Sequence, residues 1–352
     1  MDMADLYLWH WLLIFVSSGA VLSWAGTMLA RSGDEIATRT GIGRVLIGSL
    51  LVAGATSLPE ITTDVSAAAS GNPELAVGDL FGSSMANMAI LAVIDLMRRR
   101  RIWPAVELGH ARVAAIAMAL TALALIGILT PEGLTFGWVG GDSVLIAVAY
   151  VAAIAWMRRS RPRDLSPTST APVERVAVEI SELPVPIGLR GRERAELRST
   201  IIRFALSALL ILLTGPVTAR SAAGIAQTTG IGQTFIGAAL LAVATSLPEL
   251  ATAVAAVRIG AEDLAVGNLF GSNAWNMSVL LLVDLAYTSG PVLTGLAGPA
   301  EAVAGVGAIL MMAVALAAIV HGQETRIGRL EPDAILLLLV YVGALAAVWS
   351  VS

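Results

Sequence analysis

The six residues Ala55-Thr56-Ser57-Leu58-Pro59-Glu60 recur unchanged as Ala244-Thr245-Ser246-Leu247-Pro248-Glu249. Both copies lie in longer segments, 40–96 and 229–285, which align without a gap at a constant offset of 249 − 60 = 189 and are identical at about half of their positions. A repeat of this length indicates that the chain is built from two related halves.

The composition places both halves in a membrane. Of the 352 residues, 57% are apolar and only 14% are charged, whereas a soluble domain carries about 25% charged residues. The apolar residues come in runs of about 20, the length that a helix needs to cross the hydrocarbon core of a bilayer. We therefore predict an all-α polytopic membrane protein with ten transmembrane helices. The predicted spans are 7–30, 41–69, 75–97, 111–130, 135–157, 201–222, 231–258, 264–287, 300–320 and 333–350.

The arginines indicate which side of the membrane each loop occupies, because cytoplasmic loops carry an excess of basic residues. They cluster after the first, third, fifth and ninth predicted spans, with Arg220 as the exception. Both termini are therefore expected outside the cytoplasm, in a protein of the inner (plasma) membrane. The polar, proline-containing stretch 158–200 is interpreted as a mostly disordered cytoplasmic linker. It separates an N-terminal half, 1–157, from a C-terminal half, 201–352.

The spacing of the two copies predicts their relative orientation. The copies begin at the second and seventh predicted spans, and an odd number of intervening spans turns one copy upside down relative to the other. Transporters built from inverted repeats bind their substrate near the midplane, between the copies. The sequence therefore predicts two inverted five-helix repeats with a transport site between segments 40–96 and 229–285.

Glu60 and Glu249 are the residues that define the chemistry of this site. Each lies near the middle of a long apolar span, where an ionised carboxylate is costly and usually functional. The proline before each glutamate has no amide hydrogen, so it bends the helix and frees the carbonyl of Ala55 or Ala244. A purely structural hydrogen-bonding role is the alternative, but equivalent placement in two copies favours function.

Hydroxyl groups accompany each carboxylate. Thr56 and Thr245 precede their glutamates by four residues and share a helix face with them. Each threonine is followed directly by a serine, Ser57 or Ser246. Such hydroxyls also bond to their own helix backbone, so both roles stay open. Two facing motifs would form an all-oxygen cage. Ca²⁺ takes 6–8 oxygens in tolerant geometry, Na⁺ is equally hard, and Mg²⁺ is less suited because it prefers a strict octahedron.

The span after each motif supplies a second wall. Ser83 and Asn87 are four residues apart on one helix face, as are Ser272 and Asn276. Their oxygens could complete a coordination shell without adding charge, or the asparagines could simply tie helices together. The same spans carry glycine pairs at GxxxG spacing, which allow close helix packing: Gly78 with Gly82, and Gly267 with Gly271.

These motifs resemble the α-repeats of the cation/calcium antiporter superfamily, which includes the sodium/calcium exchangers, here of prokaryotic type. The resemblance rests on 54–60 with 78–87 and on 242–249 with 267–276. It implies that Glu60 and Glu249 are shared ligands of calcium and sodium, and that the first and sixth spans slide over a static core. The other implied ligands are the hydroxyls of Thr56, Ser57, Thr245 and Ser246, the carbonyls of Ala53 and Ala242, and the side chains of Ser83, Asn87, Ser272 and Asn276.

The sequence departs from the family pattern at a few positions. Asn276 stands where some relatives carry aspartate, which makes potassium co-transport less expected. These departures leave the coupling ion as the least determined property. The others are Val243 in place of glycine, and Asp79 and Ser84 in place of asparagine.

Acidic residues that only one copy carries predict an asymmetric site. Asp64 and Asp79 correspond to Ala253 and Asn268 in the second copy. We predict that the two aspartates form an acidic outer vestibule that concentrates cations. The alternative is that Asp79 caps a helix and Asp64 is a solvated end residue. Two aspartates that do match across the repeat are interpreted as anchors at span ends: Asp95 and Asp284.

We therefore expect a secondary active antiporter that exchanges Ca²⁺ for Na⁺ by alternating access. A Ca²⁺/H⁺ antiporter using the same glutamates is the alternative, because a carboxylate can also carry a proton. An intramembrane enzyme would need a base near its serines, whereas His10, His110 and His321 lie near span ends. A channel is less expected, because it does not need two inverted copies of a motif with a charge at the midplane.

The same composition limits cofactors and partners. The absence of cysteine excludes disulfides, and a net charge of −4 argues against a nucleic-acid partner. We expect no cofactor, only transported Ca²⁺ and Na⁺ or H⁺. Inorganic cations and the lipid bilayer are the expected partners, and the protein is expected to work as a monomer.

Overall fold

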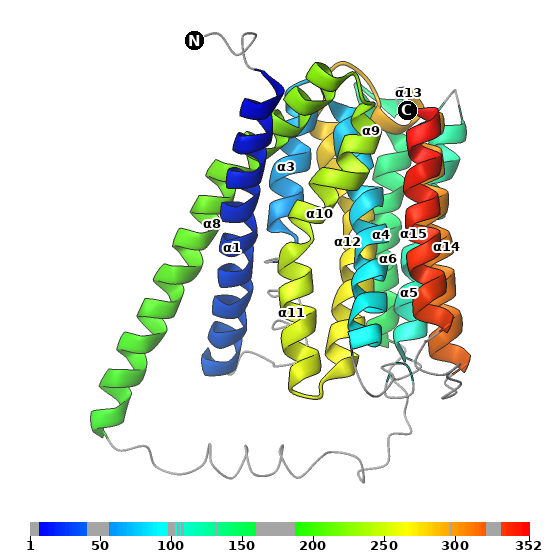
Figure 1. The fold of residues 1–352 in the computed structure, drawn as a ribbon. Coiled ribbons are helices and arrows are strands. Elements are labelled where there is room, and N and C mark those ends of the chain that lie inside the picture. The colour runs from blue at the N-terminus through cyan, green and yellow to red at the C-terminus, as the bar shows by residue number, and fades with distance from the viewer. Residues whose placement is uncertain are drawn as a thin grey trace.

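The computed structural model describes residues 7–40, 56–97, 103, 106, 109–130, 133–159, 187–295, 298–321 and 332–352. These residues form a bundle of helices that run between two ends of the molecule (Figure 1). The long helices are α1 (Leu8–Thr40), α4 (Pro73–Met97), α5 (Gly109–Leu129), α6 (Gly141–Arg159), α8 (Ile187–Thr229), α12 (Glu262–Ala286), α14 (Pro299–His321) and α15 (Pro332–Val351). The shorter helices are α3 (Leu58–Ala69), α9 (Gln233–Ile236), the π-helix η3 (Gly237–Leu241), α10 (Ala242–Thr245), α11 (Leu247–Arg258) and α13 (Val292–Gly295).

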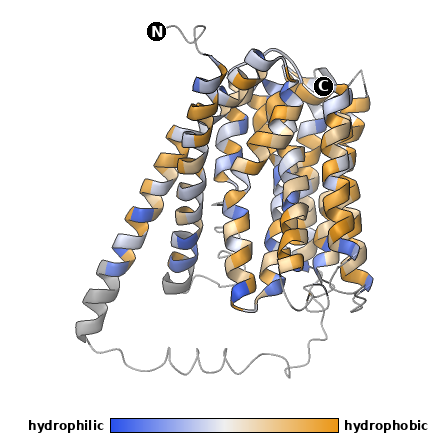
Figure 2. Ribbon diagram, viewed as in Figure 1, coloured by the Kyte–Doolittle hydropathy of each residue, from blue (hydrophilic) through white to orange (hydrophobic). Residues whose placement is uncertain are grey.

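The long helices have the length and composition of membrane spans. Seven helices in the described part of the chain are long and apolar enough to cross a membrane, and eight if one bent pair counts as a single span. Large apolar side chains such as Leu339 and Val342 point outward, and Figure 2 shows α14 and α15 as mostly hydrophobic. The protein is therefore a polytopic helical membrane protein, as predicted. The count of ten spans stays a prediction.

The two copies of the repeat fold alike and point in opposite directions. Ser57 precedes α3 with φ −87° and ψ 1°, and its equivalent Ser246 precedes α11 with φ −85° and ψ 2°. In Figure 1, α3 extends from the middle of the bundle toward the end that carries both chain termini, whereas α11 extends toward the opposite end. α4 and α12 are likewise antiparallel, so the repeated segments are inverted.

The predicted span 231–258 is a broken helix. It comprises α9, η3, α10 and α11, with a bend of 44° between Thr245 and Leu247. Pro248 causes this break, because it cannot donate to the carbonyl of Ala244. That carbonyl instead accepts a hydrogen bond from the hydroxyl of Ser23 on α1, at 3.0 Å. In the first copy, residues 41–55 lie outside the described residues, so the predicted span 41–69 is seen only from Thr56 onward.

The predicted span 135–157 is shorter than expected, because its first residues form a β-hairpin. Strands β1 (Thr135–Phe136) and β2 (Val139–Gly140) are antiparallel, with Thr135 opposite Gly140. Gly137 has a φ of +68°, a turn conformation that glycine adopts without strain. α6 therefore begins only at Gly141.

Asp284 anchors this hairpin to the end of α12. One carboxylate oxygen accepts hydrogen bonds from the amide of Gly140 at 2.7 Å and the hydroxyl of Ser143 at 2.6 Å. The other accepts from the amide of Val292 at 2.9 Å. The predicted role of Asp284 as an anchor at a span end is confirmed.

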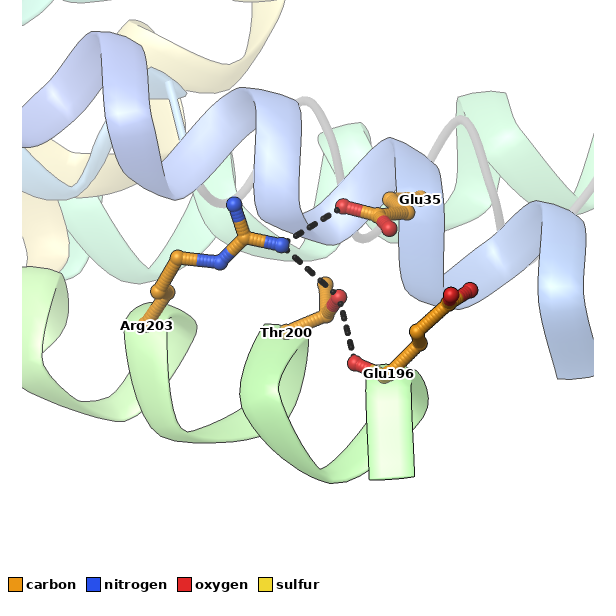
Figure 3. A network of polar contacts seen from close by, with 4 residues as sticks. All are labelled: Glu35, Glu196, Thr200 and Arg203. Atoms are coloured by element: carbon orange, nitrogen blue, oxygen red, sulfur yellow. Dashed lines mark hydrogen bonds and ion pairs between the residues drawn. The ribbon is translucent and has the colours of Figure 1, made fainter. Parts of the chain in front are cut away.

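α1 and α8 extend beyond the predicted spans and pack side by side. α8 begins at Ile187, so residues 187–200 of the predicted linker are helical rather than disordered; residues 160–186 lie outside the described residues. A polar network joins the extended part of α1 to α8. Arg203 donates to Glu35 on α1 at 3.2 Å and to Thr200 at 3.1 Å (Figure 3). This network ties the two helices together.

Glycines let α4 pack directly on the broken helix. A Cβ atom on Gly82 would lie 2.4 Å from Cα of Ala238, and one on Gly78 would lie 2.5 Å from the carbonyl oxygen of Thr234. The predicted close approach is confirmed for this pair. A Cβ atom on Gly271 would have no atom of another described segment within 4 Å. Its expected neighbour by repeat symmetry is residue 49 (238 − 189), which lies outside the described residues.

Candidate functional site

The predicted site residues gather in the buried centre of the bundle. None of the eleven that the structure describes exposes more than 2% of its surface, and Ala53 lies outside the described residues. The first copy contributes Thr56, Ser57, Glu60, Ser83 and Asn87, and the second contributes Ala242, Thr245, Ser246, Glu249, Ser272 and Asn276. The two motifs, 189 residues apart, thus meet in one interior region.

Glu60 and Glu249 occupy equivalent positions in the first turns of α3 and α11. Both are fully buried, neither faces lipid, and they lie close enough to interact electrostatically. The side chain of Thr56 lies beside Glu249. None of the four carboxylate oxygens has a hydrogen-bond partner among the described residues. Buried charges are normally paired or bound to a metal, so this pair requires an external cation or a proton.

Several neutral polar atoms at the centre also lack a partner. Buried polar atoms are nearly always hydrogen-bonded, so a cluster of unsatisfied atoms points to an absent ligand. Together with the four carboxylate oxygens they make ten unsatisfied atoms on the predicted site residues that the structure describes. The neutral ones are the hydroxyl oxygens of Ser57, Ser246 and Ser272, the amide oxygen of Asn87, and both amide atoms of Asn276.

The two asparagines behave differently because the repeat is imperfect. The amide nitrogen of Asn87 donates to Asn273 at 2.8 Å, which leaves the Asn87 oxygen free. The residue equivalent to Asn273 in the first copy is Ser84, whose hydroxyl donates to the backbone of Leu80 instead. Asn276 therefore lacks the equivalent partner. Asn87 therefore both ties two helices together and offers a free oxygen to the site. Asn273, its hydrogen-bond partner, was visible in the sequence only as a position where the two copies differ.

Hydroxyl contacts close one flank of the site. The hydroxyl oxygens of Ser83 and Thr245 lie 3.3 Å apart, so α4 and α10 touch there. The equivalent pair is Ser272 and Thr56, and the Ser272 hydroxyl has no partner among the described residues. Thr245 also bonds to its own helix at Leu241, as expected for a membrane threonine. The site is thus asymmetric although its sequence is nearly symmetric.

Asp64 and Asp79 do not form an outer vestibule, because both side chains are fully buried. Asp79 is not a helix cap either, since α4 begins six residues earlier at Pro73. It accepts hydrogen bonds from Thr63, Ser83 and Thr245, at 3.4, 3.4 and 3.2 Å. The vestibule prediction is therefore wrong: the two aspartates border the site itself.

The donor set of the site suits hard cations bound as cargo. Among the described residues no three histidine, aspartate or glutamate side chains converge as in a conventional metal site. Two carboxylates surrounded by hydroxyl and amide oxygens instead match the oxygen ligands of calcium and sodium.

A membrane bundle of inverted helix repeats around a buried group of unsatisfied oxygens defines a protein of the transporter class. The family pattern described as "Sodium/calcium exchanger protein" matches residues 10–158 and 199–350. The chain belongs to this family, whose members are exchangers rather than enzymes, and it is a cation antiporter of the membrane. The resemblance stated from the repeat motifs is thereby confirmed.

Known proteins match most of the chain. "Putative antiporter CaxA" of Alkalimonas amylolytica is 28% identical over 338 residues, 94% of this chain and 96% of that protein. "Inner membrane protein YrbG" of Escherichia coli is 28% identical over 290 residues, 80% of this chain and 79% of that protein. The fold is similar to that of the sodium-calcium exchanger NCX_Mj, with a TM-score of 0.58 at 20% identity, covering 96% and 99% of the two chains.

Proposed function

We propose that this protein exchanges Ca²⁺ for Na⁺ by alternating access at a midplane site held by Glu60 and Glu249. The observation that carries the proposal is the group of ten buried, unsatisfied atoms around these two carboxylates. Calcium takes 6–8 oxygens and fully compensates two negative charges. Sodium needs the same oxygens, so the two ions compete for one cage, and competition at one site is what couples an exchanger.

The asymmetry of the site supports an alternating mechanism. Ser83 and Thr245 are in contact on one flank, whereas the equivalent Ser272 hydroxyl has no hydrogen-bond partner among the described residues. Because the copies are inverted, exchanging these two arrangements would expose the site to opposite sides of the membrane. In the proposed cycle α1 and α8, joined by the ion pair of Arg203 and Glu35, slide together over the other helices.

The proposed membrane topology has ten spans in two inverted halves, 1–157 and 201–352. The basic residues Arg31 of α1, Arg198 of α8 and Arg258 of α11 lie on helix portions directed away from the end that bears both termini (Figure 1). By the positive-inside rule the end with these arginines, opposite the termini, faces the cytoplasm. We place the monomer in the plasma membrane with both termini outside.

The topology is testable because the chain has no cysteine. Ser352→Cys introduces a thiol at the exposed C-terminus, and Arg159→Cys introduces one at the end of α6. A membrane-impermeant maleimide added to intact cells is expected to label Ser352→Cys, and to label Arg159→Cys only after permeabilisation. The reverse pattern would invert the topology, and labelling of both in intact cells would exclude an odd number of crossings between them.

The coupling ion is tested in proteoliposomes loaded with sodium at equal pH on both sides. Dilution into sodium-free medium is expected to drive uptake of ⁴⁵Ca²⁺, because outward sodium movement supplies the energy. A pH gradient without sodium is expected to drive none. Uptake that follows the pH gradient and ignores sodium would instead identify a Ca²⁺/H⁺ antiporter that uses the same two glutamates.

A further inference from the structure

A second pair of acids lies beside the proposed exchange site. Asp79 on α4 is fully buried and accepts hydrogen bonds from three hydroxyls, those of Thr63, Ser83 and Thr245. An ionised carboxylate can only accept hydrogen bonds, so these three hydroxyls are placed to stabilise a negative charge on Asp79. Because Ser83 and Thr245 belong to the exchange site, the charge of Asp79 directly adjoins it.

Asp64 has no such support. It lies one helical turn after Glu60, is fully buried, and neither of its carboxylate oxygens has a hydrogen-bond partner among the described residues. Its carboxyl lies close enough to that of Asp79 for a direct interaction, and two adjacent buried carboxyls hold either a shared proton or a bound cation. The ion pairs seen in the described part of the chain join His110 with Asp263 and Arg203 with Glu35, and none reaches either aspartate.

The second copy of the repeat shows the equivalent helix contact without the two carboxyls. The equivalents of Asp64 and Asp79 are Ala253 and Asn268 (offset 189). The amide of Asn268 donates to Thr252 at 3.4 Å, which reproduces the contact of Asp79 with Thr63. A neutral residue thus makes the equivalent helix contact, so this contact does not by itself require the two carboxyls of the first copy.

We propose that Asp64 and Asp79 form an additional binding position for one Na⁺ ion, next to Glu60 and lined by the hydroxyls of Thr63, Ser83 and Thr245. Hydroxyls that can donate surround the Asp79 carboxyl, whereas no described side chain donates to that of Asp64, so one negative charge on the pair lacks compensation. One monovalent cation compensates it, whereas Ca²⁺ is better served by the two glutamates. Carboxylate and hydroxyl oxygens are suitable ligands for such a hard ion.

The position makes the two flanks of the exchanger unequal. Sodium bound here lies on the side of α3 and α4 only, because the equivalent region of α11 and α12 carries Ala253 and Asn268. The inference extends the proposed function by adding a sodium-specific position to the shared cage. The inference depends on the proposed function only for the route by which the sodium ion enters. The binding of the ion does not depend on it.

The experiment measures equilibrium binding of ²²Na⁺ to purified full-length protein, without any transport step. Asp79→Asn and Asp64→Ala reproduce residues that the second copy tolerates, so both variants are expected to fold. Each is expected to bind one Na⁺ fewer, or to bind it roughly 10- to 100-fold more weakly. Asp34→Asn, which neutralises an exposed aspartate on α1, is the matched control and is expected to bind sodium like the wild type.

Several outcomes would overturn the inference. Wild-type sodium stoichiometry and affinity in both aspartate variants would exclude the site. So would an unchanged sodium count accompanied by the loss of one bound proton, because the pair would then share a proton instead of a cation. Should Asp64→Ala unfold, Asp64→Asn gives the same comparison. Wild-type protein that binds sodium at this pair but moves calcium only with a pH gradient would refute sodium coupling and leave the site intact.

Discussion

Replacing either Glu60 or Glu249 by glutamine is expected to abolish calcium exchange. Each substitution removes one of two ligand carboxylates from a fully buried site. Removing one partner of a buried charge pair costs about 2–5 kcal/mol, which corresponds to roughly 30-fold to several-thousand-fold in affinity. Glutamine keeps the shape of the side chain, so the loss reports charge rather than packing. The measurement is ⁴⁵Ca²⁺ uptake into proteoliposomes under a sodium gradient.

Thermal unfolding separates lost binding from lost folding. Without cations, both variants are expected to melt at or above the temperature of the wild type, because an uncompensated buried charge has been removed. Calcium is expected to raise the melting temperature of the wild type and not of the variants. Glu196→Gln, on the exposed part of α8, serves as the control and should behave like the wild type. Calcium exchange that persists in either glutamine variant would refute the two-glutamate site.

Gly26→Ala is expected to disrupt the contact on which α1 rests. A Cβ atom at this position would lie 2.5 Å from Cγ of Pro248 and 3.1 Å from Cγ of Pro59. Both neighbours are rigid proline rings at the two helix breaks, so neither can turn aside. Overpacking of this kind costs about 1–3 kcal/mol. We expect a lower melting temperature and a transport rate reduced by more than about tenfold, because α1 passes these prolines in the proposed cycle.

The same helix provides the control for this substitution. A Cβ atom on Gly19 would lie 3.6 Å from Cβ of Ala244, an ordinary contact, so Gly19→Ala is expected to keep both stability and rate. Gly215 of α8 is also tightly packed, since a Cβ atom there would lie 2.4 Å from the side chain of Thr62. If Gly26→Ala transports like Gly19→Ala, α1 is not closely packed on the two breaks.

The repeated motif predicted the main features of the site. The identical prolines and glutamates, together with the odd number of spans between the copies, were sufficient to expect broken helices, inverted copies and two buried carboxylates near one another. The physical reason is that a midspan charge and a midspan proline each carry a large local cost. Features with such a cost are visible without knowledge of the tertiary contacts.

Features that depend on partners from distant segments could not be predicted in this way. The bond from Ser23 to the freed carbonyl of Ala244 joins residues 221 positions apart, and nothing in the repeat singles out Ser23. The hairpin at 135–140 interrupts an apolar run, because Asp284 holds its backbone from α12. Asp64 and Asp79 were placed in a solvated vestibule, since sequence position alone does not distinguish a span end from a buried flank.

Local chemistry in the printed sequence thus accounts for the membrane bundle, the inverted halves and the identity of the paired glutamates, because each follows from hydropathy, proline geometry or a repeated charge. Packing in three dimensions assigns the rest: which oxygens remain without partners, which flank is closed by Ser83 and Thr245, and where the extra aspartates point. These outcomes depend on which side chain reaches which across the bundle, and a single mismatch between the copies, such as Ser84 opposite Asn273, is enough to change them.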